Sequence, residues 1–192
     1  MWKLSLALLI YSSSVFADDQ WPNAQCEHCL PLTVNDVQVM LPIDGLVESG
    51  PGMGGGAGDL AFVAIYDNAD QVTILRAGID DLVPGLLDSE QFREEYHSCL
   101  SCLMQLAVES PDLDTTNELV GRVVRAFEID TDRSKSYRRE DVTAVWIPGE
   151  TEPGIRSDQL LVQRQGSEKV YLMTGRFNHH LAERVLASLR YL

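Results

Sequence analysis

Basic residues are scarce in this 192-residue chain. It has 15 Lys and Arg against 29 Asp and Glu, a formal net charge of −14. Proteins that bind nucleic acids present basic surfaces, so this balance argues against a nucleic-acid partner. Long apolar runs are also missing, because none reaches the roughly 18 residues of a membrane span. Apolar residues nevertheless make up 45% of the chain, too many for intrinsic disorder. The length fits a single domain.

Familiar catalytic motifs are absent as well. The sequence has no Gly-x-Ser-x-Gly nucleophile elbow and no His-Glu-x-x-His zinc helix. Nothing marks two of its many carboxylates as a general acid and a general base. His179 and His180 are adjacent, and on a helix their rings point about 100° apart, so one metal does not readily take both. We therefore expect no catalytic residue, metal or cofactor, and the sequence favours a function without catalysis.

The N-terminus has the pattern of a secretory signal peptide. Lys3 is the only charge before Asp18, and residues 4–10 form an apolar core. Residues 15–17, Val-Phe-Ala, have the small-x-small pattern that signal peptidase recognises. We predict cleavage after Ala17, which makes residues 1–17 the signal peptide and residues 18–192 a single exported domain. The mature protein is expected to be periplasmic or secreted.

The four cysteines lie in two Cys-x-x-Cys motifs, Cys26 to Cys29 and Cys99 to Cys102. In an oxidising compartment an even cysteine count predicts disulfides. The pattern of residues 88–110 predicts one amphipathic helix, in which Cys99 and Cys102 lie one turn apart. Helical neighbours have Cβ atoms about 5–6 Å apart, whereas a disulfide needs about 3.5–4.5 Å. We therefore expect both to bond with Cys26 and Cys29, with the exact pairing left open.

These cross-links are expected to be structural, because closing a loop of about seventy residues is worth roughly 4 kcal/mol. Two alternatives use the same cysteines. One is a thiol–disulfide redox centre, since a histidine between the cysteines, as at His28, lowers a thiol pKa. Such a motif should follow a strand and open a helix, but residues 18–25 are polar and contain Pro22. The other alternative is a zinc site with four cysteine ligands.

The rest of the chain predicts a mixture of helices and strands. Tight turns rather than helical crossovers join the strands. We therefore predict an α+β domain, an antiparallel sheet with helices packed on one face. The clearest hairpin sets Val162 opposite Tyr171 and Leu160 opposite Met173 across a turn at Gly166. The predicted strands are 37–41, 60–66, 71–76, 142–147, 159–165 and 168–174, and the predicted helices are 88–110, one after Pro111 and one capped by Asn178.

A glycine-rich stretch covers residues 49–58. It lacks the Lys-Ser/Thr that a phosphate-binding loop requires, so it predicts a loop between strands that offers a contact surface. The glycines of this candidate contact loop are Gly50, Gly52, Gly54, Gly55, Gly56 and Gly58.

Together these features predict an exported envelope protein that acts by binding. A strongly negative charge attracts basic partners, so the expected partner is a basic envelope or secreted protein. Inhibitors and immunity proteins against cationic envelope-attacking enzymes have this profile, as do envelope accessory proteins. The alternative function is thiol–disulfide redox or zinc-dependent activity at the two cysteine motifs.

Overall fold

The structure, a computed structural model, describes residues 21–24, 26–52, 61–68, 70–114, 117–149 and 157–192. The predicted signal peptide, residues 1–17, lies outside these residues, as do Gly54, Gly55, Gly56 and Gly58. Nowhere in the described part of the chain is a helix both long and apolar enough to cross a membrane.

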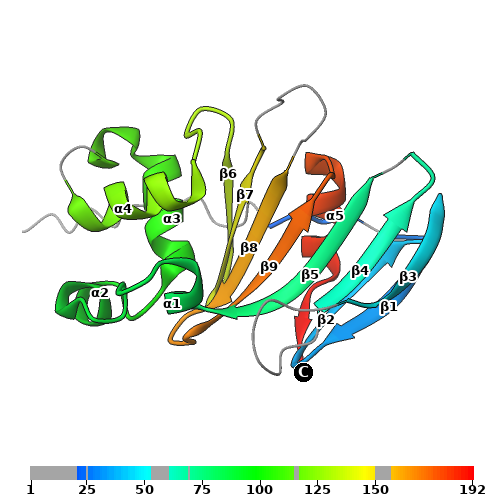
Figure 1. The fold of residues 1–192 in the computed structure, drawn as a ribbon, viewed down its shortest axis with the longest axis horizontal. Coiled ribbons are helices and arrows are strands. Elements are labelled where there is room, and N and C mark those ends of the chain that lie inside the picture. Colours follow the sequence, from blue (N-terminus) through cyan, green and yellow to red (C-terminus); the bar gives the residue numbers. More distant parts are fainter. Residues whose placement is uncertain (1–20, 25, 53–60, 69, 115–116, 150–156) are drawn as a thin grey trace, which may run out of the picture.

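A large antiparallel sheet of seven strands forms the centre of the described fold (Figure 1). Its strand order is β3-β4-β5-β9-β8-β7-β6, and a smaller sheet has the order β1-β2-β10. All neighbouring pairs are antiparallel. The strands are β1 (Cys29–Val34), β2 (Val37–Pro42), β3 (Leu46–Gly52), β4 (Ala61–Tyr66), β5 (Gln71–Gly78), β6 (Lys135–Arg139), β7 (Val142–Ile147), β8 (Asp158–Arg164), β9 (Lys169–Gly175) and β10 (Arg190–Tyr191).

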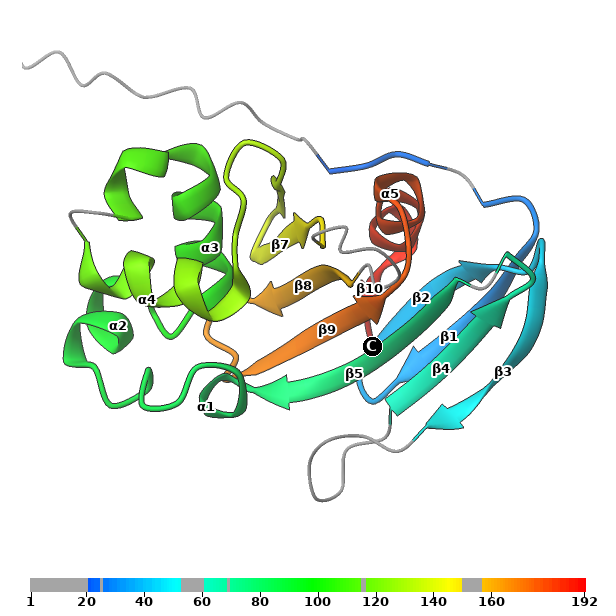
Figure 2. The same cartoon turned by 45° about the horizontal axis from the view of Figure 1, so that its top comes forward.

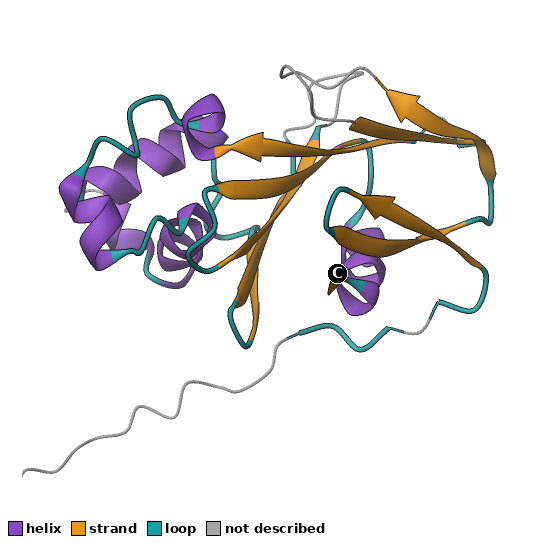
Figure 3. Ribbon diagram, turned by 90° about the horizontal axis from the view of Figure 1, so that it is seen from below, coloured by secondary structure: helices purple, strands orange, loops and turns teal. Residues whose placement is uncertain are grey.

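Helices cover both faces of the large sheet. The helices between β5 and β6 pack on one face, at the β6–β9 end of the sheet. In contrast, α5 (His179–Ser188) packs on the opposite face beside the small sheet (Figures 2 and 3). The first group consists of α1 (Ile79–Leu82), α2 (Glu90–Glu95), α3 (Leu100–Glu109), a short 3-10 helix (Pro111–Asp114) and α4 (Glu118–Phe127).

Alternation along the central strands separates two apolar cores. In β8, Leu160 and Val162 join the core formed with α5 and the small sheet, whereas Leu161 joins the core formed with α1–α4. Successive side chains of a strand point to opposite faces, and here both faces are covered. β7 and β9 alternate in the same way.

The predicted α+β class and antiparallel sheet are confirmed. The register of the closing hairpin is also confirmed, with Val162 opposite Tyr171 and Leu160 opposite Met173. The structure adds the second sheet, and it places α5 on the face opposite the other helices.

The prediction of a loop over residues 49–58 is wrong for its first part. Gly50 and Gly52 lie in β3, where they pair with Val63 and Ala61 of β4. β3 is the outermost strand of the large sheet and most of its side chains are exposed, so it has no alternating apolar pattern to detect. β1 is missing from the predicted strands because it contains Pro31. An edge strand tolerates proline, because one of its sides makes no hydrogen bonds to a neighbouring strand.

Candidate functional site

The four cysteines lie in two close local pairs that are placed to form disulfides, Cys26 with Cys29 and Cys99 with Cys102. Their Cα atoms are 5.8 Å and 5.2 Å apart, within the range of disulfides. The expected cross-links between the N-terminal segment and the first long helix are therefore wrong. Cys29 begins β1 in the small sheet, and Cys99 precedes α3 on the other face of the large sheet, so the two motifs do not meet.

The same separation leaves the four-cysteine zinc site unassembled. Within the ranges that the structure describes, no three His, Cys, Asp or Glu side chains are grouped to hold a metal ion.

The local pairing at Cys99 follows from a break in the predicted helix 88–110. α2 ends at Glu95, after which His97 and Ser98 adopt left-handed conformations with φ of 50° and 56°. The helix starts again at Leu100, with Cys99 as its N-cap in extended conformation. The distance that disfavours a disulfide applies when both cysteines lie inside a helix, whereas Cys99 lies outside it. An N-cap side chain instead folds back over the first turn, which brings Cys99 to Cys102.

The two sulfur atoms of this pair differ in access. Cys99 is 1% exposed, and its Sγ accepts a hydrogen bond from the backbone N–H of Cys102 at 3.2 Å. Cys102 is partly exposed, and its Sγ lies 3.7 Å from Oγ1 of Thr143 in β7. Cys102 is therefore the more accessible cysteine of the pair.

Polar side chains gather around the pair where the rest of the core is apolar. Of the five buried polar or charged side chains among the described residues, three are at this site: Ser101, Thr143 and Gln163. Gln163 accepts a hydrogen bond from the backbone N–H of Ser101 and donates one to the carbonyl oxygen of Ser98, both at 3.0 Å. Gln163 thus holds the backbone on both sides of Cys99.

Sequence reasoning missed Gln163 and Thr143. They are direct partners across β7 and β8, on the face that packs against α3. A signal was present, because each is a polar residue that continues an apolar every-second-residue pattern, Thr143 with Val145 and Gln163 with Leu161.

An open pocket of about 180 Å³ lies beside Cys102. Its wall includes Cys102, Thr143, Glu95, Arg138, Glu140 and Asp141. Asp141 pairs with Arg164 at 2.6 Å, and the hydrogen bond from Arg164 lowers the pKa of the Asp141 carboxyl below its ordinary value. The pocket thus has several charged residues in its wall, opens to solvent and borders the Cys99–Cys102 pair.

The pair of Cys26 and Cys29 has a different setting. Both cysteines are partly exposed at the start of β1. The motif's histidine, His28, lies 3.7 Å from Asp44, and the two side chains are 70% and 75% exposed. Neither sulfur is protected here, in contrast to Cys99.

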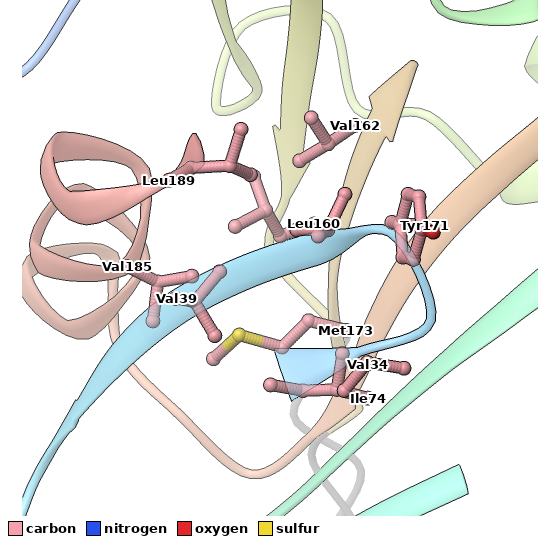
Figure 4. Close-up of a pocket in the computed structure, with 10 residues that line it drawn as sticks. Val34, Val39, Ile74, Leu160, Val162, Tyr171, Met173, Val185 and Leu189 are labelled. Atoms are coloured by element: carbon pink, nitrogen blue, oxygen red, sulfur yellow. The ribbon is translucent and has the colours of Figure 1, made fainter. Parts of the chain in front are cut away.

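A second cavity lies between the two sheets and α5 (Figure 4). It measures only about 20 Å³ and is lined by apolar side chains from β2, β8, β9 and α5, with the Tyr171 ring at one side. Binding sites for small molecules combine apolar walls with a few polar groups that orient the ligand. This cavity is therefore an internal packing void and not a candidate site.

His179 is packed against aromatic rings. Its ring centroid is 4.7 Å from that of Trp146, and Nε2 contacts the hydroxyl of Tyr137. Glu183 lies one turn along α5, with Oε1 3.6 Å from Nε2. Burial lowers the pKa of His179 below its ordinary value, against the opposing effect of Glu183.

Comparison with known proteins adds no assignment to this geometry. No protein-family model matches the chain, and the search of curated proteins found no match.

Proposed function

We propose that this protein carries out thiol–disulfide exchange in an oxidising compartment, with Cys99 and Cys102 as its redox pair. The proposal rests on the asymmetry of two sulfur atoms at one helix N-terminus. Cys102 lines an open pocket, and Cys99 is buried with a backbone N–H directed at its sulfur. Helix N-termini stabilise a thiolate through such N–H groups and the helix dipole.

In the oxidised protein, exchange starts when a thiolate RS⁻ attacks Sγ of Cys102. The Cys99–Cys102 bond breaks, a mixed disulfide forms at Cys102, and Cys99 leaves as a thiolate. A second RS⁻ attacks the RS sulfur of the mixed disulfide, which forms RSSR and releases the Cys102 thiolate. The two thiolates of the protein take up the two protons that the RSH molecules gave up. The backbone N–H of Cys102, directed at Sγ of Cys99, stabilises the thiolate that leaves.

The size of the disulfide ring supports the same function. In the chain-entropy model, a bond between residues three apart is worth about 2 kcal/mol, against about 4 kcal/mol for the long loop expected from the sequence. The local bond therefore contributes less to stability than the long-range cross-link expected from the sequence.

Redox titration with dithiothreitol, a neutral reagent, tests the proposal, with alkylation and peptide mass spectrometry as the readout. We expect Cys99 and Cys102 to titrate at potentials above about −300 mV, below which structural disulfides lie. Cys99→Ser should trap a mixed disulfide at Cys102, whereas Cys102→Ser should trap none at the buried Cys99. A pair that stays oxidised well below that potential would refute the proposal, as would equal trapping by both variants.

Export is the second component of the proposal, and the residues that support it are 1–17. The polypeptide recovered from its native host should have Asp18 as its N-terminal residue, which its intact mass will show. An intact Met1 with four alkylatable thiols would place the protein in a reducing compartment and overturn this component.

Binding without chemistry is the second candidate function, favoured by the net charge of −14. In that case both disulfides are structural, and the partner is a basic envelope or secreted protein, as for an inhibitor, immunity protein or envelope accessory protein. Capture from an envelope extract separates the two functions. A basic protein retained at low salt, released at high salt and still bound by the Cys99→Ser/Cys102→Ser variant would support binding. Failure to retain one would remove this candidate.

A further inference from the structure

We propose that the Cys99–Cys102 pair is selective for peptide or protein substrates that carry Lys or Arg next to the reacting cysteine. The inference rests on the proposed exchange function and names its substrate class. It is drawn from the pocket beside Cys102 and from its charges.

The size of the pocket favours a side chain of a larger partner. Its volume of about 180 Å³ is below the roughly 300–1,000 Å³ typical of sites for whole small molecules. Cys102 is in the pocket wall, so the group that enters the pocket is a side chain next to the substrate cysteine that reacts with Cys102.

The charges of the pocket favour a basic side chain. Three carboxylates, Glu95, Glu140 and Asp141, line it together with the guanidinium of Arg138 and the imidazole of His97. Arg164 holds Asp141 in an ion pair. The side chains of Glu95, Glu140 and Arg138 are exposed, Arg164 also interacts electrostatically with Glu140, and the whole chain adds a net charge of −14. A negative cleft raises the local concentration of cationic groups and repels anionic ones.

Glu95 and Glu140 belong to different elements of the fold. Glu95 ends α2, immediately before the break that sets up Cys99, and Gln91 donates a hydrogen bond to its Oε2 at 2.9 Å. Glu140 occupies the turn between β6 and β7 with φ of 53°. The two glutamates thus reach the pocket from separate segments of the chain.

The test measures oxidation of the reduced protein by three disulfide-linked peptides, acetyl-Lys-Cys-Lys-amide, acetyl-Ser-Cys-Ser-amide and acetyl-Glu-Cys-Glu-amide. Each reaction converts the Cys99/Cys102 dithiol and one peptide disulfide into the protein disulfide and two peptide thiols. We expect the Lys peptide to react faster than the Glu peptide by roughly tenfold at low salt, and the ratio to fall as salt screens the charges. The intrinsic reactivities of the peptides cancel when this ratio is compared between variants.

Glu95→Gln and Glu140→Gln should each lower the Lys-to-Glu ratio by roughly twofold to threefold. Glu48→Gln is the matched control, because it removes the same charge from β3 at the other edge of the large sheet. An equal effect of Glu48→Gln, or a Glu peptide that reacts faster than the Lys peptide, overturns the selectivity. If no peptide and no dithiothreitol exchanges with the pair, the proposed function itself fails.

Discussion

The side-chain oxygen of Gln163 accepts a hydrogen bond from the backbone N–H of Ser101 at 3.0 Å, although 62 residues separate them in the chain. The Nε2 of the same amide donates to the carbonyl oxygens of Ser98 and Ser167. One buried residue of β8 thus ties the Cys99 loop to the sheet and to the turn before β9. The position of the Cys99–Cys102 pair depends on this side chain.

Gln163→Leu should lower the free energy of unfolding by about 3 kcal/mol, because the Ser101 N–H and the Ser98 carbonyl are left buried without a partner. Urea denaturation measures this change. Gln165→Leu is the control, since Gln165 is exposed, and its effect should stay within about 0.5 kcal/mol. Equal effects of the two substitutions would show that the hydrogen bonds of Gln163 contribute little.

The cysteine pairing shows where reasoning from the sequence stops. The distance argument for a helical Cys-x-x-Cys was sound, but it depended on an unbroken helix. The break comes from the left-handed conformations of His97 and Ser98, which are stabilised by packing and by Gln163 from a distant strand. Apolar periodicity continues across the break, from Phe92 to Leu103, and so conceals it.

A tryptic peptide map under non-reducing conditions should locate each disulfide within one peptide. The chain has no Lys or Arg between Lys3 and Arg76, nor between Arg93 and Arg122. Cys26 and Cys29 therefore share one fragment, and Cys99 and Cys102 share residues 94–122. Reduction should raise the mass of each fragment by two hydrogens without splitting it. A single disulfide-linked species that contains both fragments would instead support the pairing expected from the sequence.

Stability should fall as the pH drops through the range just below 6.5, because of His179. Burial lowers the pKa of His179 in the folded protein, whereas in the unfolded chain it titrates near its ordinary value of 6.5. Between the two pKa values the unfolded chain binds more protons, so lowering the pH favours unfolding. His179→Gln should flatten this slope in urea denaturation series from pH 5 to pH 8.

His180→Gln is the matched control for this prediction. It removes a neighbouring histidine whose side chain is 65% exposed, so the slope should remain. A slope that survives His179→Gln but disappears with His180→Gln would contradict the assignment.

The sheet was predicted best where a strand is covered on both faces or alternates cleanly. β4, β5, β7, β8 and β9 all meet that condition and lie inside the sheet. β1 and β3 are edge strands. Proline and glycine have low strand propensity, so Pro31 in β1 and the glycines of β3 argue against strands in the sequence, although an edge strand tolerates them. Thr143 of β7 and Gln163 of β8 lie at positions with the periodicity of core residues, but they were not identified from the sequence as buried polar residues.

Two glycine substitutions should differ sharply in their effect on stability. Gly175 ends β9 with φ of 139°, and a Cβ there would collide with the carbonyl oxygen of Gln71, which also accepts a hydrogen bond from the N–H of Arg176. Gly175→Ala should therefore cost more than about 2 kcal/mol of unfolding free energy.

Gly50 in β3 has no described atom within 4 Å of an added Cβ and no positive φ. Gly50→Ala should be neutral or stabilise by up to about 1 kcal/mol, because it restricts only the unfolded chain. Thermal and urea denaturation of both variants measure the difference, and a loss at Gly50 as large as that at Gly175 would contradict the open edge of β3.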